Sequence, residues 1–351
     1  MGRDLRDAVA VVTGASSGTG AATALALAEA GATVVLVARR ADALERVAER
    51  CRALGADATA APADVTDGEA LEAVARDTVA RHGRVDLWVH AAGVTLVGRT
   101  EEVPAGLWRR TVDVDLVGAF HSAQAALPWF REQGAGVLVL ITPALGGLTP
   151  AQQSAAVASA LGVRGLADCL RHETADADGV HVVTVVSGPV DTPLLDHAAN
   201  HSGLHPVPPV PPLDPREVAA AVVSVARRPR GPGGLRARDE VVVGPGGAGA
   251  GSREVDPAAT ADRALLRRPT PATDGTLWEP RAETGGRLDG GWRDGDRPDG
   301  VRPTWVVPGG VVAAGVAAAG TPGRGPGRLA AALAVVSAAV GIAAAARGRR
   351  R

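Results

Sequence analysis

The sequence predicts an α/β fold, a doubly wound parallel sheet with helices on both faces. Two observations support this prediction. Short Val-rich apolar runs alternate repeatedly with longer Ala- and Leu-rich segments of helical periodicity between residues 8 and 243. Strands that alternate with helices in this way pair in parallel and place their helices on both sides of the sheet. In addition, the first apolar run is followed by a glycine-rich turn and then by a helical pattern.

The first three elements are Ala8–Val12, the turn Thr13–Gly20 and the helical pattern Ala21–Ala30. In such a turn one glycine allows a tight bend, the next allows backbone N–H groups to approach an anion, and the last allows close packing of the helix on the sheet. The helix directs unpaired N–H groups and the positive end of its dipole at the turn. An ordinary tight turn is the alternative. The order of elements predicts a dinucleotide site formed by Gly14, Ser16, Ser17, Gly18, Thr19 and Gly20.

Each further strand is predicted from a run of β-branched and apolar residues. In order, these runs are Thr33–Val37, Ala58–Ala63, Val85–His90, Gly136–Ile141, Val180–Val186 and Glu240–Val243. The helices follow from apolar residues at helical spacing, and they are Ala41–Leu54, Asp67–His82, Pro104–Arg131, Ala151–Ala175 and Asp214–Arg228. Gly55 is a stop signal, and Pro215 suits a first helical position. The proline-rich stretch Pro206–Pro215 is extended, as a stiff substrate lid or as a plain linker.

The composition narrows the class of protein. The formal net charge of −1 gives no overall attraction to nucleic acid. Cys51 and Cys169 provide no disulfide framework, and we expect no metal site. Met1–Asp4 leads directly into the first strand, so we expect no signal peptide. The chain contains no tyrosine and no lysine, so every side-chain cation of fixed charge is an arginine.

The end of the second predicted strand indicates which dinucleotide fits. In dinucleotide-binding folds an acidic residue at this point accepts the 2′-hydroxyl of NAD. Here Ala38 offers no carboxylate, whereas Arg39 and Arg40 can bind a 2′-phosphate. The sequence therefore favours NADP(H) over NAD(H). The alternative is a pair of surface arginines at the start of a helix.

Residues 5 to about 243 resemble the short-chain dehydrogenase/reductase family. Thr13–Gly20 is similar to the family's cofactor motif, and residues 90–93, His-Ala-Ala-Gly, resemble its Asn-Ala-Ala-Gly turn. The resemblance implies a Rossmann-type subunit that binds NAD(P)H and forms homo- or hetero-oligomers through its long helices, here residues 104–131 and 151–175. It also implies cofactor contacts at Asp64, Val65, Ala91, Ala92, Gly93, Gly188 and Thr192.

The resemblance also locates the family's catalytic groups. A tyrosine protonates the substrate oxygen, a lysine four residues later lowers the pKa of that tyrosine, and a serine and an asparagine complete the set. The helix register places Ala156 at the tyrosine position and Ala160 at the lysine position, while Pro143 replaces the serine and Asp115 the asparagine. A phenol with a pKa of about 10 needs a nearby cation to act as an acid at pH 7. We therefore expect ordinary carbonyl reduction to be impaired.

Three functions remain open at this point. The first is a pseudoenzyme that binds the cofactor and acts as a scaffold, NADPH sensor or partner subunit. The second is an NADP-dependent oxidoreductase that acts on an unknown carbonyl or alcohol through other groups, with Asp115 and Thr142 as candidates. The third is a structural subunit that pairs with an active relative through the two long helices.

The composition changes after the predicted folded domain, which comprises residues 1–245. Residues 246–304 are rich in Arg, Asp, Gly and Pro and predict a largely disordered linker, with a short helix at Ala258–Arg268 and an isolated apolar spot at Leu277–Pro280. Residues 305–351 are apolar and end in arginines. Leu329–Ala346 is uncharged and, as a helix, would be roughly 27 Å long. We predict a membrane-associated tail that holds a cytoplasmic domain at the membrane; an Ala-rich soluble or surface-lying helix is the alternative.

Overall fold

The computed structural model describes residues 4–143, 150–208, 211–229, 240–244, 247–248, 266–280 and 286–293. Its centre is an eight-stranded sheet with the order β11-β10-β7-β6-β4-β1-β2-β3. Neighbouring strands pair in parallel except β10 and β11, which are antiparallel. The strands are β1 (Val9–Thr13), β2 (Thr33–Ala38), β3 (Ala58–Pro62), β4 (Leu87–His90), β6 (Gly136–Pro143), β7 (Val180–Ser187), β10 (Glu240–Gly244) and β11 (Gly247–Ala248).

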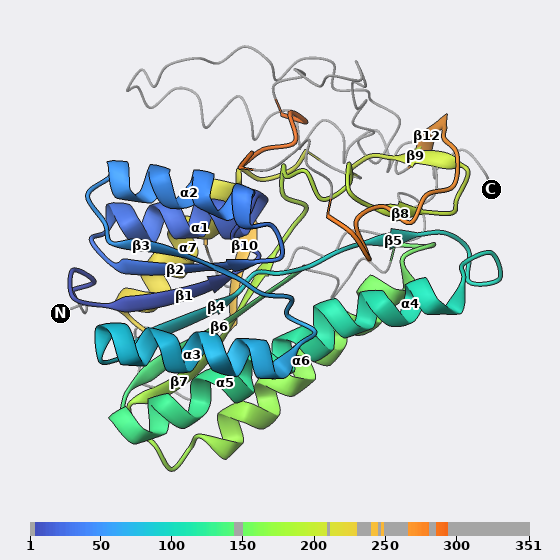
Figure 1. Cartoon of the computed structure of the whole chain (residues 1–351). Coiled ribbons are helices and arrows are strands. Elements are labelled where there is room, and N and C mark those ends of the chain that lie inside the picture. The colour runs from blue at the N-terminus through green and yellow to red at the C-terminus, as the bar shows by residue number, and fades with distance from the viewer. Residues whose placement is uncertain are drawn as a thin grey trace, which may run out of the picture. The chain divides into compact units, whose positions relative to one another are not determined.

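Helices cover both faces of this sheet (Figure 1). One face carries α1 (Gly18–Glu29), α2 (Ala41–Ala53) and α7 (Pro215–Arg227). The other face carries α3 (Gly68–His82), α5 (Gly118–Gln133) and α6 (Ser154–Glu173), with α4 (Ala105–Val112) before α5 in the chain. The predicted parallel sheet with helices on both sides is therefore confirmed.

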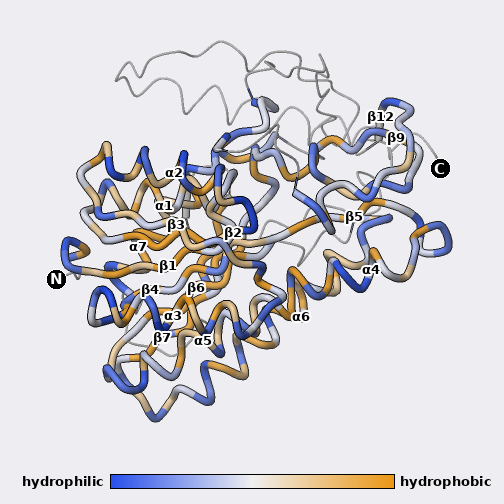
Figure 2. The backbone as a smooth tube through the Cα atoms, viewed as in Figure 1, coloured by the Kyte–Doolittle hydropathy of each residue, from blue (hydrophilic) through white to orange (hydrophobic). Residues whose placement is uncertain are grey.

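The core lies on both sides of the sheet because the central strands are continuous runs of buried apolar residues. Figure 2 shows these strands as hydrophobic and the outer turns of the helices as largely hydrophilic. Leu27 and Leu36 belong to the cluster on one side of the sheet. Trp88, Phe130 and Leu138 belong to the cluster on the other side. The strands are thus held between two apolar layers, which fixes the positions of the residues at their carboxyl ends.

Local signals explain several element ends. α7 starts with a capping box, in which the Asp214 carboxylate accepts the Arg216 N–H and the Glu217 carboxylate accepts the Asp214 N–H. α3 ends at Gly83, whose φ of 76° suits a glycine C-cap. The single helix expected over Pro104–Arg131 is interrupted by a π-helical turn, η1 (Asp113–Val117). Such turns occur frequently at functional sites.

Two small sheets lie beyond the carboxyl ends of the central strands (Figure 1). In one, β5 (Leu96–Val97) pairs with β8 (Ala199–Asn200). In the other, β9 (Leu204–Pro206) pairs with β12 (Leu266–Pro269). β9 directly precedes the proline-rich stretch and shares only Pro206 with it, and β12 lies in the segment predicted to be a linker.

Two expectations about the linker are wrong where the structure describes it. Leu266–Pro269 is a strand, so the helix expected over Ala258–Arg268 does not extend through residues 266–268. Residues 266–280 and 286–293 pack on the domain instead of forming a disordered linker. Leu277 is 1 % exposed and Trp292 is 2 % exposed. Both side chains fill apolar sites supplied by residues far away in the sequence, and composition alone carries no signal for such sites.

The predicted membrane-associated tail, residues 305–351, lies outside the described residues. Within the part of the chain that the structure describes, no helix has both the length and the apolar character that a membrane crossing requires.

Candidate functional site

A cavity of about 440 Å³ opens at the carboxyl ends of the parallel strands. Ligands of open parallel sheets bind where the strand order reverses, which here is between β1 and β4. Every cofactor residue expected from the sequence lines this cavity: Gly14, Ser16, Ser17, Gly18, Thr19, Gly20, Arg39, Arg40, Asp64, Val65, Ala91, Ala92, Gly93, Gly188 and Thr192. The four positions that the family resemblance assigns to the catalytic groups line it as well: Asp115, Pro143, Ala156 and Ala160.

The glycine-rich turn has the geometry of a pyrophosphate cradle. Gly14 has a φ of 68°, and a Cβ there would lie 2.6 Å from the carbonyl oxygen of Ala91. A Cβ on Gly20 would lie 2.3 Å from the carbonyl oxygen of Gly14. The N-cap of α1, Ser17, makes no capping hydrogen bond with its side chain. The backbone N–H groups in the first turn of α1 therefore point toward the cavity, and the side chain of Ser17 does not cap them.

One N–H of this turn is already used. The backbone N–H of Gly18 donates a hydrogen bond to the carbonyl of Arg287 over 2.8 Å, and the N–H of Gly286 donates to the carbonyl of Ser16 over 2.8 Å. From the sequence, Gly18 is expected to let backbone N–H groups approach the anion. Because its own N–H is bonded to Arg287, these groups would be the N–H groups of the residues after Gly18.

Arg39 is held by the C-terminal segment. Its Nη1 donates to the carbonyl oxygens of Leu277 and Trp278, over 3.2 and 3.0 Å, and its Nη2 donates to the carbonyl oxygen of Thr276 over 2.7 Å. Burial lowers the pKa of Arg39, but the guanidinium remains the charged form at neutral pH. Sequence reasoning missed these partners because they are main-chain atoms more than 230 residues away.

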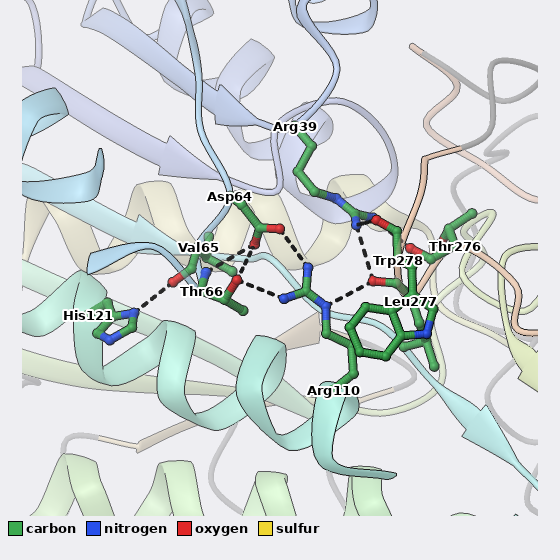
Figure 3. Close-up of polar contacts among 9 residues, drawn as sticks. All are labelled: Arg39, Asp64, Val65, Thr66, Arg110, His121, Thr276, Leu277 and Trp278. Atoms are coloured by element: carbon green, nitrogen blue, oxygen red, sulfur yellow. Dashed lines mark hydrogen bonds and ion pairs between the residues drawn. The ribbon is translucent and has the colours of Figure 1, made fainter. Parts of the chain in front are cut away.

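Arg110, which the sequence analysis did not single out, connects Asp64 to the same segment (Figure 3). Its Nη2 lies 2.6 Å from Asp64 Oδ2, its Nη1 donates to Thr66 Oγ1 over 2.8 Å, and its Nε donates to the carbonyl of Leu277 over 3.0 Å. The Trp278 ring lies against the guanidinium, 5.4 Å from Cζ to the ring centroid. Burial raises the pKa of Asp64, but the hydrogen bonds from Thr66 and Arg110 outweigh burial and hold that pKa below its ordinary value.

Two histidines close to the cavity, His121 and His90, make structural contacts, while a third, His197, lines the cavity itself. His121 donates from Nδ1 to the carbonyl of Val65 over 3.0 Å (Figure 3). His90, at the family's asparagine in the Asn-Ala-Ala-Gly turn, is 1 % exposed and is not among the cavity-lining residues. Its Nδ1 lies 2.9 Å from Ser122 Oγ and 3.2 Å from Thr13 Oγ1. Burial lowers the pKa of His90 to about 4, so the ring is neutral at pH 7 and joins the ends of β1 and β4 to α5.

The positions that the resemblance assigns to the catalytic groups gather where β6, η1 and α6 meet the cavity. Ala156 and Ala160 present methyl groups one helical turn apart, and neither can donate a proton. The remaining polar side chains there are Asp115, Thr142 and Ser159. Within the described residues, the hydroxyl oxygens of Thr142 and Ser159 are buried without a hydrogen-bond partner. The cavity therefore contains polar groups, but it lacks the phenol and ammonium pair.

Asp115 is the only one of these groups that titrates. It is partly accessible, and the accessible surface faces the cavity that it lines. Its Oδ1 accepts the Val94 N–H over 2.8 Å. Burial raises the pKa of Asp115 to about 8, and this one hydrogen bond only partly opposes the effect. At pH 7 Asp115 is therefore protonated and can donate a hydrogen bond. Arg164 does not offset a negative charge on Asp115, because Arg164 forms an ion pair with Glu240 over 2.9 Å.

The fold and the cavity together define a dinucleotide-binding protein of the Rossmann type. The chain belongs to the short-chain dehydrogenase family, because the family model described as short chain dehydrogenase matches residues 8–202.

Curated relatives match over part of their length. Glycine betaine reductase ATRR of Emericella nidulans is 38 % identical over 187 residues, which are 53 % of this chain and 15 % of that protein. The uncharacterized oxidoreductase YxnA of Bacillus subtilis is 30 % identical over 231 residues, 65 % of each protein. Cyclohexanol dehydrogenase of an Acinetobacter species is 34 % identical over 211 residues, 59 % of this chain and 83 % of that enzyme. The chain thus spans less than two thirds of the first two relatives.

Solved structures agree with the family. The alcohol dehydrogenase of Thermococcus sibiricus, complexed with 5-hydroxy-NADP, has a TM-score of 0.58 and 27 % identity, and the match covers 67 % of this chain and 95 % of that enzyme. A metagenomic short-chain oxidoreductase in complex with NADP has a TM-score of 0.58 and 28 % identity, with 69 % and 98 % covered. A nicotinamide cofactor is therefore the ligand class that this fold supports.

Proposed function

We propose that this chain is an NADP(H)-binding member of the family whose ordinary carbonyl chemistry is impaired. One observation carries the proposal. The same cavity is lined by all of the expected cofactor residues and by Ala156 and Ala160, where the family has its acid and the cation that activates it. A cavity lined by the expected cofactor residues thus adjoins a reaction centre without its usual proton donor.

The preference for NADP(H) is part of this proposal. Ala38 provides no carboxylate for a 2′-hydroxyl, and both Arg39 and Arg40 line the cavity. Arginine binds phosphate through two parallel hydrogen bonds and keeps its charge at any physiological pH. Two solved relatives were crystallised with NADP or a hydroxylated NADP, which supports the same choice.

The proposed impairment follows from what the methyl groups cannot do. A bound nicotinamide cofactor supplies or accepts a hydride, and the protein has to move the matching proton. A positioned general acid contributes about 10²- to 10⁴-fold to such a step. Loss of a donor to the developing oxyanion costs on the order of 10²- to 10³-fold more in comparable enzymes. These factors do not simply multiply, but together they should bring reduction of a simple ketone close to background.

Asp115 supports a second candidate, an oxidoreductase with a different proton donor. Because its pKa is about 8, Asp115 holds a proton at pH 7 and can release it near that pH. Hydride addition to a carbonyl carbon would then be matched by transfer of the Asp115 proton to the carbonyl oxygen. Thr142 and Ser159 line the same cavity, and within the described residues their buried hydroxyls have no hydrogen-bond partner, so we propose that they bind that oxygen.

The decisive experiment uses the full-length protein. Calorimetric titration with NADPH and NADH tests binding, and a panel of ketones, aldehydes and alcohols tests turnover. The double variant Ala156→Tyr with Ala160→Lys restores the family pair, and Ala156→Phe with Ala160→Lys is its matched control without the phenol. We expect NADPH binding with slow turnover in the natural protein and at least a ~100-fold gain in the tyrosine variant alone.

Three results would redirect the proposal. Rapid turnover by the natural protein that disappears in Asp115→Asn would establish the second candidate. Rapid turnover that survives Asp115→Asn would contradict both candidates. An absence of cofactor binding, together with co-purification of an active relative, would favour the structural subunit.

Association and membrane attachment are also proposals. The two segments expected to mediate oligomers carry exposed apolar side chains: Trp108, Phe120 and Leu161 are 38, 42 and 50 % exposed. We propose that these helices form an interface with a second copy or a relative. We also propose that residues 305–351 attach the protein to the cytoplasmic face of a membrane, on the strength of the uncharged run Leu329–Ala346.

A further inference from the structure

Residues 274–280, called the strap below, form part of the cavity wall, because Thr276 and Pro280 line the cavity. We infer that the strap is a component of the cofactor site that holds Arg39 in position for the 2′-phosphate of NADP(H). The inference rests on the proposed cofactor binding and assigns a role to a segment outside the Rossmann core.

The strap is seated at a defined position. The Leu277 side chain is buried in a small apolar cluster with Leu96, Leu107, Ala155 and Ala199. The N–H of Thr276 donates to the carbonyl of His197 over 3.0 Å. Gly275 has a φ of 58°, and a Cβ there would lie 2.3 Å from the same His197 carbonyl oxygen. Only glycine at 275 allows this close backbone approach, so the strap cannot shift along the domain without losing its contacts.

The strap uses only part of Arg39. Three of the five guanidinium N–H groups donate to the carbonyls of Thr276, Leu277 and Trp278. Within the described residues, Nε–H makes no hydrogen bond and Nη2 makes a single one, to the Thr276 carbonyl. These two groups form the side edge through which arginine binds a phosphate bidentately. The carbonyls are neutral, so the charge of Arg39 remains available to a dianion while its side chain is already ordered.

Arg110 pairs with the Asp64 carboxylate, which would otherwise compete with a phosphate for Arg39. The Asp64 carboxylate is near enough to Arg39 to oppose the lowering of its pKa. Asp64 is, however, paired with Arg110 over 2.6 Å, and Arg110 in turn donates to the Leu277 carbonyl in the strap (Figure 3). Both arginines therefore contact the same strap residue. The pairing neutralises Asp64, and Arg39 keeps a net positive charge on the cavity wall.

The strap orders Arg39 for only one group of the cofactor, the 2′-phosphate. A 2′-phosphate gains from an ordered, charged Arg39, whereas the 2′-hydroxyl of NADH gains little. Because ordering of a side chain costs binding free energy, loss of the strap should weaken NADPH more than NADH. The ratio of the two dissociation constants is therefore the quantity that reports on the strap.

The test compares two glycine substitutions in the full-length protein. Gly275→Ala introduces a Cβ that clashes with the His197 carbonyl and undocks the strap. Gly55→Ala is the matched control, because Gly55 has a comparable φ of 90° and nothing within 4 Å of the added Cβ. Leu277→Ser undocks the strap without backbone strain and serves as a second variant. Thermal unfolding confirms that each variant is folded, and calorimetry measures NADPH and NADH binding.

We expect both strap variants to bind NADPH about tenfold more weakly and NADH less than threefold more weakly, while Gly55→Ala leaves both constants unchanged. Equal weakening of the two cofactors would overturn the inference, because the strap would then be a wall without a role at Arg39. Tighter NADPH binding would also overturn it, since the strap would then compete with the phosphate. An absence of binding in the natural protein would instead reject the proposed function.

Discussion

Asp64 Oδ2 and Arg110 Nη2 lie 2.6 Å apart and link the residues after β3 to helix α4 across 46 positions of sequence. Their side chains are 29 and 12 % exposed, so solvent screens the pair only partly. Through the Leu277 carbonyl, the same guanidinium also fastens the strap. One ion pair thus joins the core of the domain to a segment that the sequence analysis assigned to a linker.

Removal of this guanidinium should destabilise the domain measurably. We expect Arg110→Met to lower the free energy of unfolding by about 1–3 kcal/mol, because Asp64 and the Leu277 carbonyl lose a charged donor. The pKa of Asp64 lies below its ordinary value, so its contribution to stability is present above that value and is lost as the pH falls through the folded-state pKa. The free energies of unfolding of the natural protein and of Arg110→Met should therefore become similar in acid. Denaturant unfolding from pH 7 down to pH 3 checks this, with the exposed Arg109→Met as control.

Asp115 should give the opposite pH dependence. Its folded-state pKa of about 8 lies above the unfolded value of 3.8, so the folded state binds the extra proton between these values. The contribution to stability is fully present below about pH 4 and is lost as the pH rises toward 8. Asp115→Asn removes the titration and can still accept the Val94 N–H. We expect the variant to be more stable than the natural protein at pH 8 and to lack this slope; a parallel slope in both proteins would contradict the assignment. Asp113→Asn in the same turn is the control.

Replacement of exposed apolar side chains of α5 and α6 by charged ones should prevent association of the protein. Phe120→Glu combined with Leu161→Glu places carboxylates on the proposed interface, where burial of an unpaired charge is costly. We expect the natural protein to be a dimer or larger and the double variant to be a monomer by light scattering. Leu54→Glu, equally exposed but at the end of α2, should leave the oligomer intact. A natural protein that is monomeric at micromolar concentration would refute the proposal.

The tail makes a prediction about fractionation. If Leu329–Ala346 enters a lipid bilayer, the full chain should sediment with membranes and resist extraction by alkaline carbonate. A chain that ends at residue 304 should remain in the supernatant and bind NADPH with unchanged affinity. Release of the full chain by carbonate or by high salt alone would indicate a surface-lying helix instead.

The sequence predicted many of the residues that line the cavity because its signals are local. The position of a tight turn, the end of a strand and the start of a helix are each encoded by residues that are neighbours in the sequence. The turn Thr13–Gly20 therefore specified the anion cradle. The parallel topology then brought the ends of distant strands to one edge, so that Asp64, Gly93 and Gly188 line one cavity as expected. The π-helical turn that carries Asp115 was not predicted, because its residues are also compatible with a regular helix.

The sequence by itself determined the order of strands and helices along the chain, the glycine-rich turn and the absence of tyrosine and lysine, since each depends on residue identity or on local periodicity. Only the tertiary structure decided that Arg39 contacts the strap, that Arg110 pairs with Asp64, and that Asp115 holds a proton at pH 7. These features depend on burial and on partners that are far apart in the chain. They are determined by main-chain carbonyls and by the exclusion of water, and neither can be predicted from the identities of the side chains alone.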